Sequence, residues 1–252
     1  MAEVSTIYFV GAGPGDPELI TVKGKKLLEE ADVVVYAGSL VKEKILGYCR
    51  KGVEIHNSAS MDLEEITGIM VKAAREGRRV VRLHTGDTAF YSALNEQASV
   101  LEREGMAYGV VPGVSSASAS AASLGRELTM PEVSQTVIVT RIAGRTPVPE
   151  AEKLSSLASH GATMCIFLSV DKIERVVEEL SVGYPPDTPA AVVYRASWED
   201  ERVLTGTLGD IAARVKEAGI TRQAIIMVGR SLAGDGKKSK LYDKEFKHGY
   251  RK

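Results

Sequence analysis

Four short segments combine glycine, proline, hydroxyl and charged residues in a way that suits ligand binding: Val10–Pro17, Arg82–Tyr91, Val110–Ser116 and Val193–Glu201. None of them places a nucleophile beside a base, because there is no G-x-S-x-G elbow, no Cys–His pair and no H-x-E before a cysteine pair. Loops of backbone polar groups, small side chains and few charges suit a reaction whose reagent is already activated, so that positioning supplies most of the acceleration. Methyl transfer from a sulfonium is such a reaction, and a plain binding module would show the same loops.

The first segment looks like a dinucleotide-binding loop but differs from it in spacing. The dinucleotide fingerprint is G-x-G-x-x-G, and it opens a helix whose N-terminus meets a pyrophosphate. Here Gly11, Gly13 and Gly15 alternate, and Pro14 stands between the last two. Proline has no N–H and a fixed φ, which suits a stiff loop better than a phosphate cradle. The loop therefore predicts a rigid binding junction without phosphate chemistry.

The other three segments also have structural interpretations. Asp87 suits the cap of a following helix, and so does one of Ser115 and Ser116. Capping does not explain the Pro-Gly break before these serines. Trp198, the one tryptophan of the chain, is interpreted as a packing residue.

Alternating strand and helix patterns must position these segments. The alternation indicates an α/β fold with a mostly parallel sheet and right-handed crossovers, and the second half repeats the theme. The expected strands are Val4–Val10, Val33–Tyr36, Val53–His56, Val80–His84, Tyr108–Val111, Gln135–Thr140, Thr163–Leu168, Ala190–Tyr194, Arg202–Thr207 and Ala224–Val228. The expected helices are Glu18–Glu30, Val41–Tyr48, Leu63–Arg75, Tyr91–Arg103, Ala151–Ala158, Asp171–Leu180 and Leu208–Ala218.

The chain has 252 residues, of which 44% are hydrophobic, enough for one large or two modest domains. The strand that ends at Val111 runs into a Pro-Gly break, which we take as the domain boundary. We therefore expect an N-terminal α/β domain at 1–112, a C-terminal α/β domain at 113–232 and a tail at 233–252.

Composition excludes several classes of function. A formal net charge of -1 gives no electrostatic footprint for nucleic acid. No apolar run approaches the roughly 20 residues that span a bilayer, and no signal segment is visible, so we expect no membrane partner and a cytoplasmic location. Two isolated cysteines form no disulfide framework, and the four histidines have no metal-ligand spacing, so no metal is expected.

Taken together, the segments resemble the tetrapyrrole methyltransferases, which methylate uroporphyrinogen and the precorrins. The likeness lies in V-G-A-G-P-G-D-P at Val10–Pro17, G-D at Gly86-Asp87 and V-P-G-V-S-S at Val111–Ser116. Further segments resemble the precorrin-4 or cobalt-precorrin-4 branch, so that the likeness covers essentially the whole chain. They are Val35–Val41, Arg82–Asp87, Glu127–Thr136, Gly144–Pro149, Val193–Trp198 and the tail segment Ser239–Phe246.

The resemblance implies two α/β domains with a cofactor cleft between them, usually in a homodimer. It implies S-adenosylmethionine as cofactor, S-adenosylhomocysteine as product and a small-molecule tetrapyrrole as substrate. The implied reaction is methylation of carbon 11 of precorrin-4 or cobalt-precorrin-4 on the way to cobalamin. Two alternatives stay open: methylation at a different ring carbon, and a non-catalytic tetrapyrrole-binding protein. No catalytic acid or base is identified, and whether the substrate already holds cobalt is left open.

The resemblance also implies the site residues. The cofactor contacts carried over are Pro14, Thr85, Gly86, Asp87, Phe90, Ser115, Ser116, Leu168, Ala196 and Ala224. Of these, Asp87 could offset a cationic ligand, and Leu168 could equally be a core residue at the end of a strand. The substrate carries many carboxylates, so basic residues near the loops are candidate partners. These are Arg82, His84, Arg126, Arg141, Arg145 and Arg195.

One departure from the family pattern falls in the second segment. The family commonly continues G-D-P and has a glycine after the tyrosine, whereas this chain has Thr88 and Ser92 at those places. The change frees an N–H at Thr88 and restricts the backbone at Ser92. We expect cofactor binding to survive, because contacts there should be made largely by the backbone.

Overall fold

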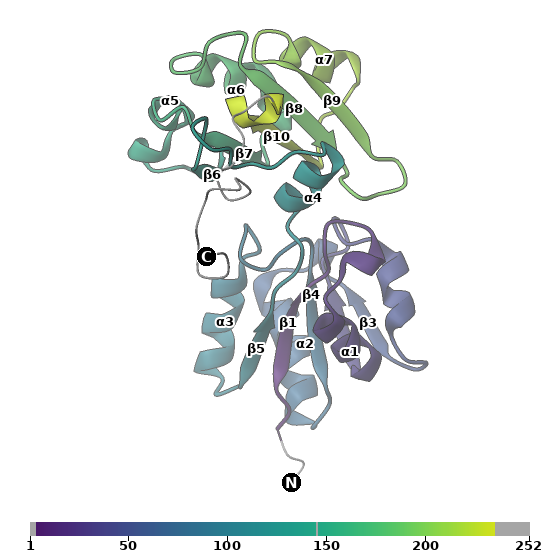
Figure 1. Cartoon of the computed structure of the whole chain (residues 1–252). Helices are drawn as coiled ribbons and strands as arrows, with labels where there is room; N and C mark the ends of the chain where they lie inside the picture. Colours follow the sequence, from purple (N-terminus) through teal and green to yellow (C-terminus); the bar gives the residue numbers. More distant parts are fainter. Residues whose placement is uncertain (1–3, 145, 235–252) are drawn as a thin grey trace, which may run out of the picture. The chain divides into compact units, whose positions relative to one another are not determined.

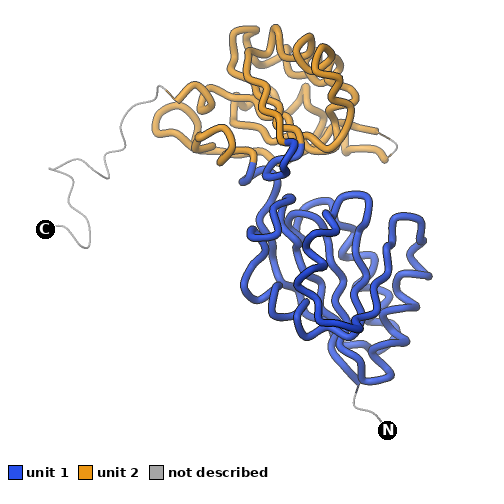
Figure 2. The backbone as a smooth tube through the Cα atoms, turned by 90° about the vertical axis from the view of Figure 1, so that its right-hand side faces the viewer, with its two compact units in different colours: residues 1–119, 195–200 blue, residues 120–194, 201–252 orange. Residues whose placement is uncertain are grey.

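A computed structural model describes residues 4–144 and 146–234, which form two compact units (Figure 2). Unit 1 contains the chain up to Ala119 together with the loop Arg195–Asp200. Unit 2 contains Ser120–Tyr194 and the chain from Glu201 onward. The division therefore falls after the Pro-Gly break that we took as the boundary. The reason is that the first residues of the helix behind that break remain packed in unit 1. The expected tail beyond Gly234 lies outside the described residues.

Unit 1 is built on a five-stranded sheet in the order β3-β2-β4-β1-β5, and every strand pair is parallel (Figure 1). Four of the strands lie within one residue of the expected bounds, and the first begins later than expected. The strands are β1 Ile7–Gly11, β2 Val33–Tyr36, β3 Glu54–Asn57, β4 Val80–His84 and β5 Tyr108–Val111.

Helices cover both faces of this sheet, so its strands are apolar on both sides. On one face, α1 and a 3-10 segment bury Val10, Val34 and Leu83. On the other, α2 and α3 bury Ile7, Phe9 and Val35. The elements are α1 Val22–Glu30, the 3-10 segment Glu43–Tyr48, α2 Leu63–Arg75 and α3 Leu94–Arg103.

Local sequence explains where the longest of these helices begins and ends. Asp62 and Glu65 form a reciprocal capping box at the start of α2, each side chain accepting a hydrogen bond from the other residue's backbone N–H at 2.9 Å. Lys72 and Arg75 stand in the last turn, where positive charge favours the helix dipole. Leu63–Arg75 is also the range expected from the sequence.

Unit 2 has a mixed sheet in the order β6-β7-β10-β8-β9 (Figure 1). Only β6 and β7 pair in parallel, whereas β10 pairs antiparallel with both of its neighbours and β8 antiparallel with β9. The expectation that the second half repeats a mostly parallel sheet is therefore wrong at the level of pairing. The strands are β6 Val137–Arg141, β7 Thr163–Phe167, β8 Pro189–Tyr194, β9 Arg202–Thr207 and β10 Ala224–Val228.

The core of unit 2 lies between its sheet and its helices. Met164, Ile166 and Val192 from the strands meet Val176 and Leu180 from α6, all of them buried. The helices are α5 Leu154–Ala158, α6 Ile173–Leu180 and α7 Ile211–Glu217, and α4 Ser116–Ser123 begins in unit 1 and ends in unit 2. Short 3-10 segments stand at Pro17–Leu19, Ser58–Ser60, Glu150–Glu152, Val170–Lys172 and Arg230–Ala233. Within the described residues, none of the helices has the length and apolar character that crossing a membrane requires.

Candidate functional site

The carboxyl ends of β1 and β4 form the switch point of the unit 1 sheet. The chain leaves β1 toward β2 on one side, and leaves β4 toward β5 on the other. Open α/β sheets bind ligands where two adjacent strands send their connections in opposite directions. A short antiparallel bridge joins Gly13 to Gly86 at this point, with N···O distances of 3.2 and 2.8 Å. The first two predicted segments therefore meet at the place where this fold binds ligands.

Three glycines at adjacent strand ends pack backbone against backbone, and we call this set the glycine cradle: Gly11, Gly86 and Gly113. A Cβ placed on Gly113 would lie 2.2 Å from the Gly86 carbonyl oxygen, and one on Gly11 would lie 2.6 Å from the Gly113 nitrogen. Both positions therefore exclude any side chain. Gly86 has φ +61°, and a Cβ placed on it would meet only ordinary contacts, the nearest of them the Ser116 nitrogen at 3.8 Å. The close packing at Gly113 explains why the Pro-Gly break has a glycine at this position.

Asp87 fixes the third strand end to the second. One carboxylate oxygen accepts a hydrogen bond from the Gly113 N–H at 3.0 Å, and the other accepts from the Ala89 N–H at 2.6 Å. The expected helix cap is therefore not formed, because α3 begins only at Leu94 and Asp87 closes a turn two residues long instead. Both partners are backbone N–H groups, so main chain holds the carboxylate in place beside the cradle.

The loop after Asp87 is partly strained and partly exposed. Phe90 is 40% exposed and Tyr91 45%, and Tyr91 and Ala93 both have φ +52° although neither is glycine. Thr88, which departs from the family pattern, is buried, and its carbonyl accepts from the Ser92 hydroxyl at 2.6 Å. The two departures thus bond to each other and close this turn.

Other cofactor candidates of unit 1 surround the cradle. The Thr85 hydroxyl donates to the Leu40 carbonyl at 3.3 Å. Ser115 is buried, and its hydroxyl accepts from the Ala117 N–H at 3.2 Å, which is the capping role foreseen for one serine. Ser116 begins α4, and its backbone nitrogen would lie 3.8 Å from a Cβ placed on Gly86.

The loop Arg195–Asp200 reaches the opening loop, although the two are far apart in sequence. The Trp198 Nε1–H donates to the Pro14 carbonyl at 2.8 Å, and the Asp16 N–H donates to the Ser197 hydroxyl oxygen at 3.0 Å. Ala196, buried, therefore lies in the same loop cluster as Pro14. The sequence interpretation of Trp198 as a packing residue agrees with this placement but omits the hydrogen bond. The partnership with Ser197 was not foreseen.

Two of the substrate candidates lie in the core of unit 1, which does not match the expectation that they line a binding surface. Arg82 is 5% exposed, and its guanidinium donates to the Gln97 side chain, the Val35 carbonyl and the Ser58 hydroxyl at 2.9–3.2 Å. His84 is 4% exposed and stacks at a tilt on Phe9, with 5.9 Å between ring centroids. Their side chains share a face that α2 and α3 cover, because residues two apart in a strand point the same way.

Burial lowers the pKa of both groups. Burial lowers the pKa of Arg82 to about 10, so the guanidinium remains charged at neutral pH. Burial, with the charge of Arg82 as a second cause, lowers the pKa of His84 to about 3. The imidazole is therefore neutral, and its Nε2 has no hydrogen-bond partner in the described structure.

The remaining candidates belong to unit 2, apart from Arg195. Leu168 follows β7 with φ +50° and is 64% exposed, so its interpretation as a core residue is wrong. Ala224 is buried in the pairing of β10 with β8. Arg126 is exposed. The Arg141 guanidinium donates to the carbonyls of Ile142, Thr146 and Pro147 at 2.9–3.3 Å and so folds the proline-rich loop.

Arg195 pairs with Asp200 at 2.6 Å, whereas Arg145 lies outside the described residues.

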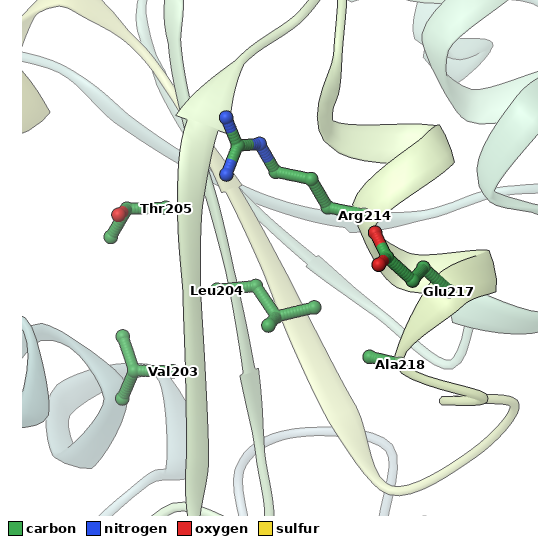
Figure 3. Close-up of a pocket in the computed structure, with 6 residues that line it drawn as sticks. All are labelled: Val203, Leu204, Thr205, Arg214, Glu217 and Ala218. Carbon is green, nitrogen blue, oxygen red and sulfur yellow. The ribbon is translucent and has the colours of Figure 1, made fainter.

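A separate surface hollow of about 340 Å³ lies between β9 and α7 of unit 2 (Figure 3). Val203, Leu204 and Thr205 line it on one side, and Arg214 on the other is paired with Asp210. It contains none of the candidate residues.

The site in unit 1 offers backbone groups, hydroxyls, one carboxylate and exposed aromatic surface. The described residues contain no group of three or more His, Cys, Asp or Glu that could hold a metal ion. Such a site can orient a small ligand through main-chain groups, and it has no evident acid–base pair.

The fold is that of an α/β protein whose N-terminal parallel sheet gathers backbone polar groups, hydroxyls and a carboxylate at the carboxyl ends of its strands. Residues 6–212 match the family described as Tetrapyrrole (Corrin/Porphyrin) Methylases, and the chain belongs to this family. The α/β fold class and the resemblance drawn from the sequence are thereby confirmed.

Individual relatives are more specific. The chain is 58% identical to a cobalt-precorrin-4 C(11)-methyltransferase of Methanocaldococcus jannaschii, over 98% of this chain and 96% of the relative. Among solved structures, it is similar to the cobalt precorrin-4 methyltransferase CbiF, with a TM-score of 0.88, 49% identity and coverage of 90% and 95% of the two chains. A uroporphyrin-III C-methyl transferase from Thermus thermophilus, complexed with S-adenosyl homocysteine, matches with a TM-score of 0.74 and 28% identity over 93% and 96%.

Proposed function

We propose that the protein transfers a methyl group from S-adenosylmethionine to carbon 11 of precorrin-4 or cobalt-precorrin-4 in cobalamin biosynthesis. The observation that carries the proposal is the glycine cradle, where three strand ends pack backbone against backbone without intervening side chains. The full-length likeness to relatives named for this reaction supports it. The relative with 58% identity is named for the cobalt-containing substrate, which favours that form.

The residues around the cradle fit S-adenosylmethionine. We assign its contacts in unit 1 to Pro14, Thr85, Gly86, Asp87, Phe90, Ser115, Ser116 and Ala196, and in unit 2 to Leu168 and Ala224. A site of backbone N–H and C=O groups can hold the amino-acid and adenine ends of such a ligand. An acidic side chain at Asp87 suits a cationic sulfonium. When bound, this cofactor supplies an electrophilic methyl group whose leaving group is a neutral thioether.

The chain's own contribution is then alignment rather than proton chemistry. The Gly13–Gly86 bridge and the bond from Gly113 to Asp87 fix three loops with respect to one another within unit 1. Fixed loops hold a reacting pair in line without reorganisation at the moment of reaction. Exposed Phe90 and Tyr91 offer aromatic surface that can exclude water from the methyl group.

The substrate's carboxylates need cationic partners, and we propose Arg126, Arg141 and Arg195 for this role. Arg82 and His84 are poorer candidates because both are buried. As the resemblance implies, we also propose a homodimer that acts in the cytoplasm on a small-molecule substrate. Light scattering on the purified protein tests the oligomeric state.

Turnover of the two substrate forms side by side under anaerobic conditions tests the reaction. With methyl-labelled S-adenosylmethionine, we expect the label at carbon 11 of cobalt-precorrin-4, located by NMR. A label at another ring carbon would refute the position, and a spectral shift without any transfer would favour a non-catalytic tetrapyrrole-binding protein. Faster turnover of the cobalt-free form would assign precorrin-4 as the substrate.

A matched pair of glycine variants tests the site. Gly113→Ala places a methyl group 2.2 Å from the Gly86 carbonyl, whereas Gly68→Ala in α2 meets nothing within 4 Å. We expect the first to abolish binding of S-adenosylhomocysteine in calorimetry and the second to leave it unchanged. Equal affinity in both variants would refute the cradle as the cofactor site.

A further inference from the structure

The loop Arg195–Asp200, which we call the clasp loop, makes a reciprocal pair of hydrogen bonds with the opening loop. It joins β8 to β9, two strands of unit 2, yet it belongs to unit 1. Its Trp198 donates to the Pro14 carbonyl at 2.8 Å, and its Ser197 hydroxyl accepts from Asp16 at 3.0 Å. One bond runs in each direction, so the two loops are fixed in register as well as in distance.

The tryptophan ring lies directly against the backbone of Gly15. A Cβ on Gly15 would stand 2.1 Å from Trp198 Cδ1 and 2.2 Å from its Nε1. No side chain fits there, so the third glycine of the opening loop serves the tryptophan rather than a ligand. The partly buried indole is thereby held on one face by main chain.

Charged residues surround the same ring. Lys42 Nζ lies 5.6 Å and Arg195 Cζ 5.0 Å from the ring centroid, which are cation–π distances. Glu199, the next residue, bridges Lys42 at 3.0 Å and Lys44 at 3.5 Å. The hydrogen bond from Lys42 is the main cause that lowers the pKa of the Glu199 carboxyl. The clasp loop is thus fixed from the side of Lys42 as well.

The backbone of the clasp loop is strained. Arg195 has φ +48° and Ser197 φ +69°, and both carry side chains that disfavour the left-handed region. Such strain persists only where the surroundings determine the conformation, and it collects at functional sites. Between these two residues stands Ala196, one of the assigned cofactor contacts.

From these contacts we propose that Trp198 and Ser197 are positioning residues for the cofactor. They touch neither the cofactor nor the substrate in this role, which rests on the proposed function. They act through Pro14, whose carbonyl Trp198 holds, and through Ala196, whose strained neighbours they fix. Without the two hydrogen bonds, Pro14 and Ala196 are no longer held in a fixed position relative to each other. The affinity for the cofactor therefore falls, whereas kcat at saturating cofactor does not.

Three variants test the proposal on the full chain. Trp198→Phe keeps an aromatic side chain and removes the N–H, Ser197→Ala removes the acceptor, and Gly15→Ala drives a methyl group into the indole. For each of the first two we expect about fivefold weaker binding of S-adenosylhomocysteine and a matching rise in KM for S-adenosylmethionine, the loss of one net hydrogen bond. Gly15→Ala should weaken binding further, with kcat at saturating cofactor unchanged in Trp198→Phe and Ser197→Ala.

Matched controls separate positioning from general stability. Ser181→Ala removes an exposed hydroxyl that donates within unit 2, and Gly68→Ala adds a methyl group where nothing lies within 4 Å. Both should leave affinity and KM at the wild-type values. Equal affinity of wild type, Trp198→Phe and Ser197→Ala would overturn the positioning role alone. If wild type itself fails to bind S-adenosylhomocysteine, the proposed function fails and the positioning role falls with it.

Discussion

Removing the buried imidazole of His84 should abolish a specific part of the protein's sensitivity to acid. Burial, followed by the charge of Arg82, lowers the pKa of this histidine from its ordinary 6.5 to about 3. Its folded-state pKa lies below its unfolded value, so the unfolded chain binds a proton at pH values where the folded chain does not. Stability from this group is therefore full above about pH 6.5 and is lost as the pH falls toward about 3.

The size of the effect follows from the two pKa values. Each unit of difference corresponds to about 1.36 kcal/mol, so the complete loss approaches roughly 5 kcal/mol. At about pH 5 the unfolded imidazole is almost fully protonated and the folded one is not, which gives a loss of about 2 kcal/mol relative to neutral pH. That loss is a large part of the free energy of unfolding of an ordinary domain, about 5–15 kcal/mol.

Urea unfolding followed through the single tryptophan measures this difference, because Trp198 reports on unit 1, where His84 lies. We compare wild type with His84→Leu, which removes the titratable ring, including an Nε2 without a hydrogen-bond partner in the described structure, and keeps an apolar side chain at this buried position. Between neutral pH and about pH 5, wild type should lose about 2 kcal/mol more stability than the variant. His160→Leu, at an exposed histidine of unit 2, is the matched control and should follow wild type. The reasoning is refuted if wild type and His84→Leu lose the same stability to within about 0.5 kcal/mol.

Three further outcomes are expected. Tyr184→Phe removes a buried hydroxyl that donates to the Ala162 carbonyl, and it should lower the free energy of unfolding by about 1 kcal/mol in urea titrations; no change would show that the bond is not needed. Burial raises the pKa of the Cys165 thiol to about 12, so mass spectrometry should find it alkylated only after denaturation, and rapid native labelling would contradict its burial. Leu168→Gly relieves a φ of +50° at an exposed side chain, so it should leave stability unchanged or raise it by up to about 1 kcal/mol while weakening S-adenosylhomocysteine binding; lower stability would refute the strain.

Most strands of the chain could be predicted from the sequence because they are short runs rich in β-branched residues. Their directions in unit 2 could be predicted less well. Only seven residues separate Tyr194 at the end of β8 from Arg202 at the start of β9, and a parallel crossover needs about a dozen. The antiparallel pairing of β8 with β9 could therefore have been predicted from the length of their connection. That of β10 with β7 and β8 was not, because a helix precedes β10 as it would in a parallel crossover.

The positions of Arg82 and His84 show a different limit. Their charge and their nearness to a loop suggested contact with substrate carboxylates. Strands of a parallel sheet are covered on both faces, however, so a charged residue inside such a strand is buried whichever face it takes. Arg82 tolerates burial because it donates hydrogen bonds to the side chains of Gln97 and Ser58, which belong to two other elements. No local sequence pattern around Arg82 predicts these partners.

The opening loop shows why glycine spacing alone could not decide what it binds. Gly11 is required because the Gly113 backbone approaches it, Gly13 because its φ is +80°, and Gly15 because Trp198 lies against it. In a dinucleotide fingerprint, the second glycine lets the backbone approach a pyrophosphate, whereas here two of the three glycines are required because other parts of the protein approach them. Residues far from the loop in sequence therefore determine part of the spacing. Packing and backbone conformation within the protein therefore account for all three glycines, and their spacing by itself identifies no ligand.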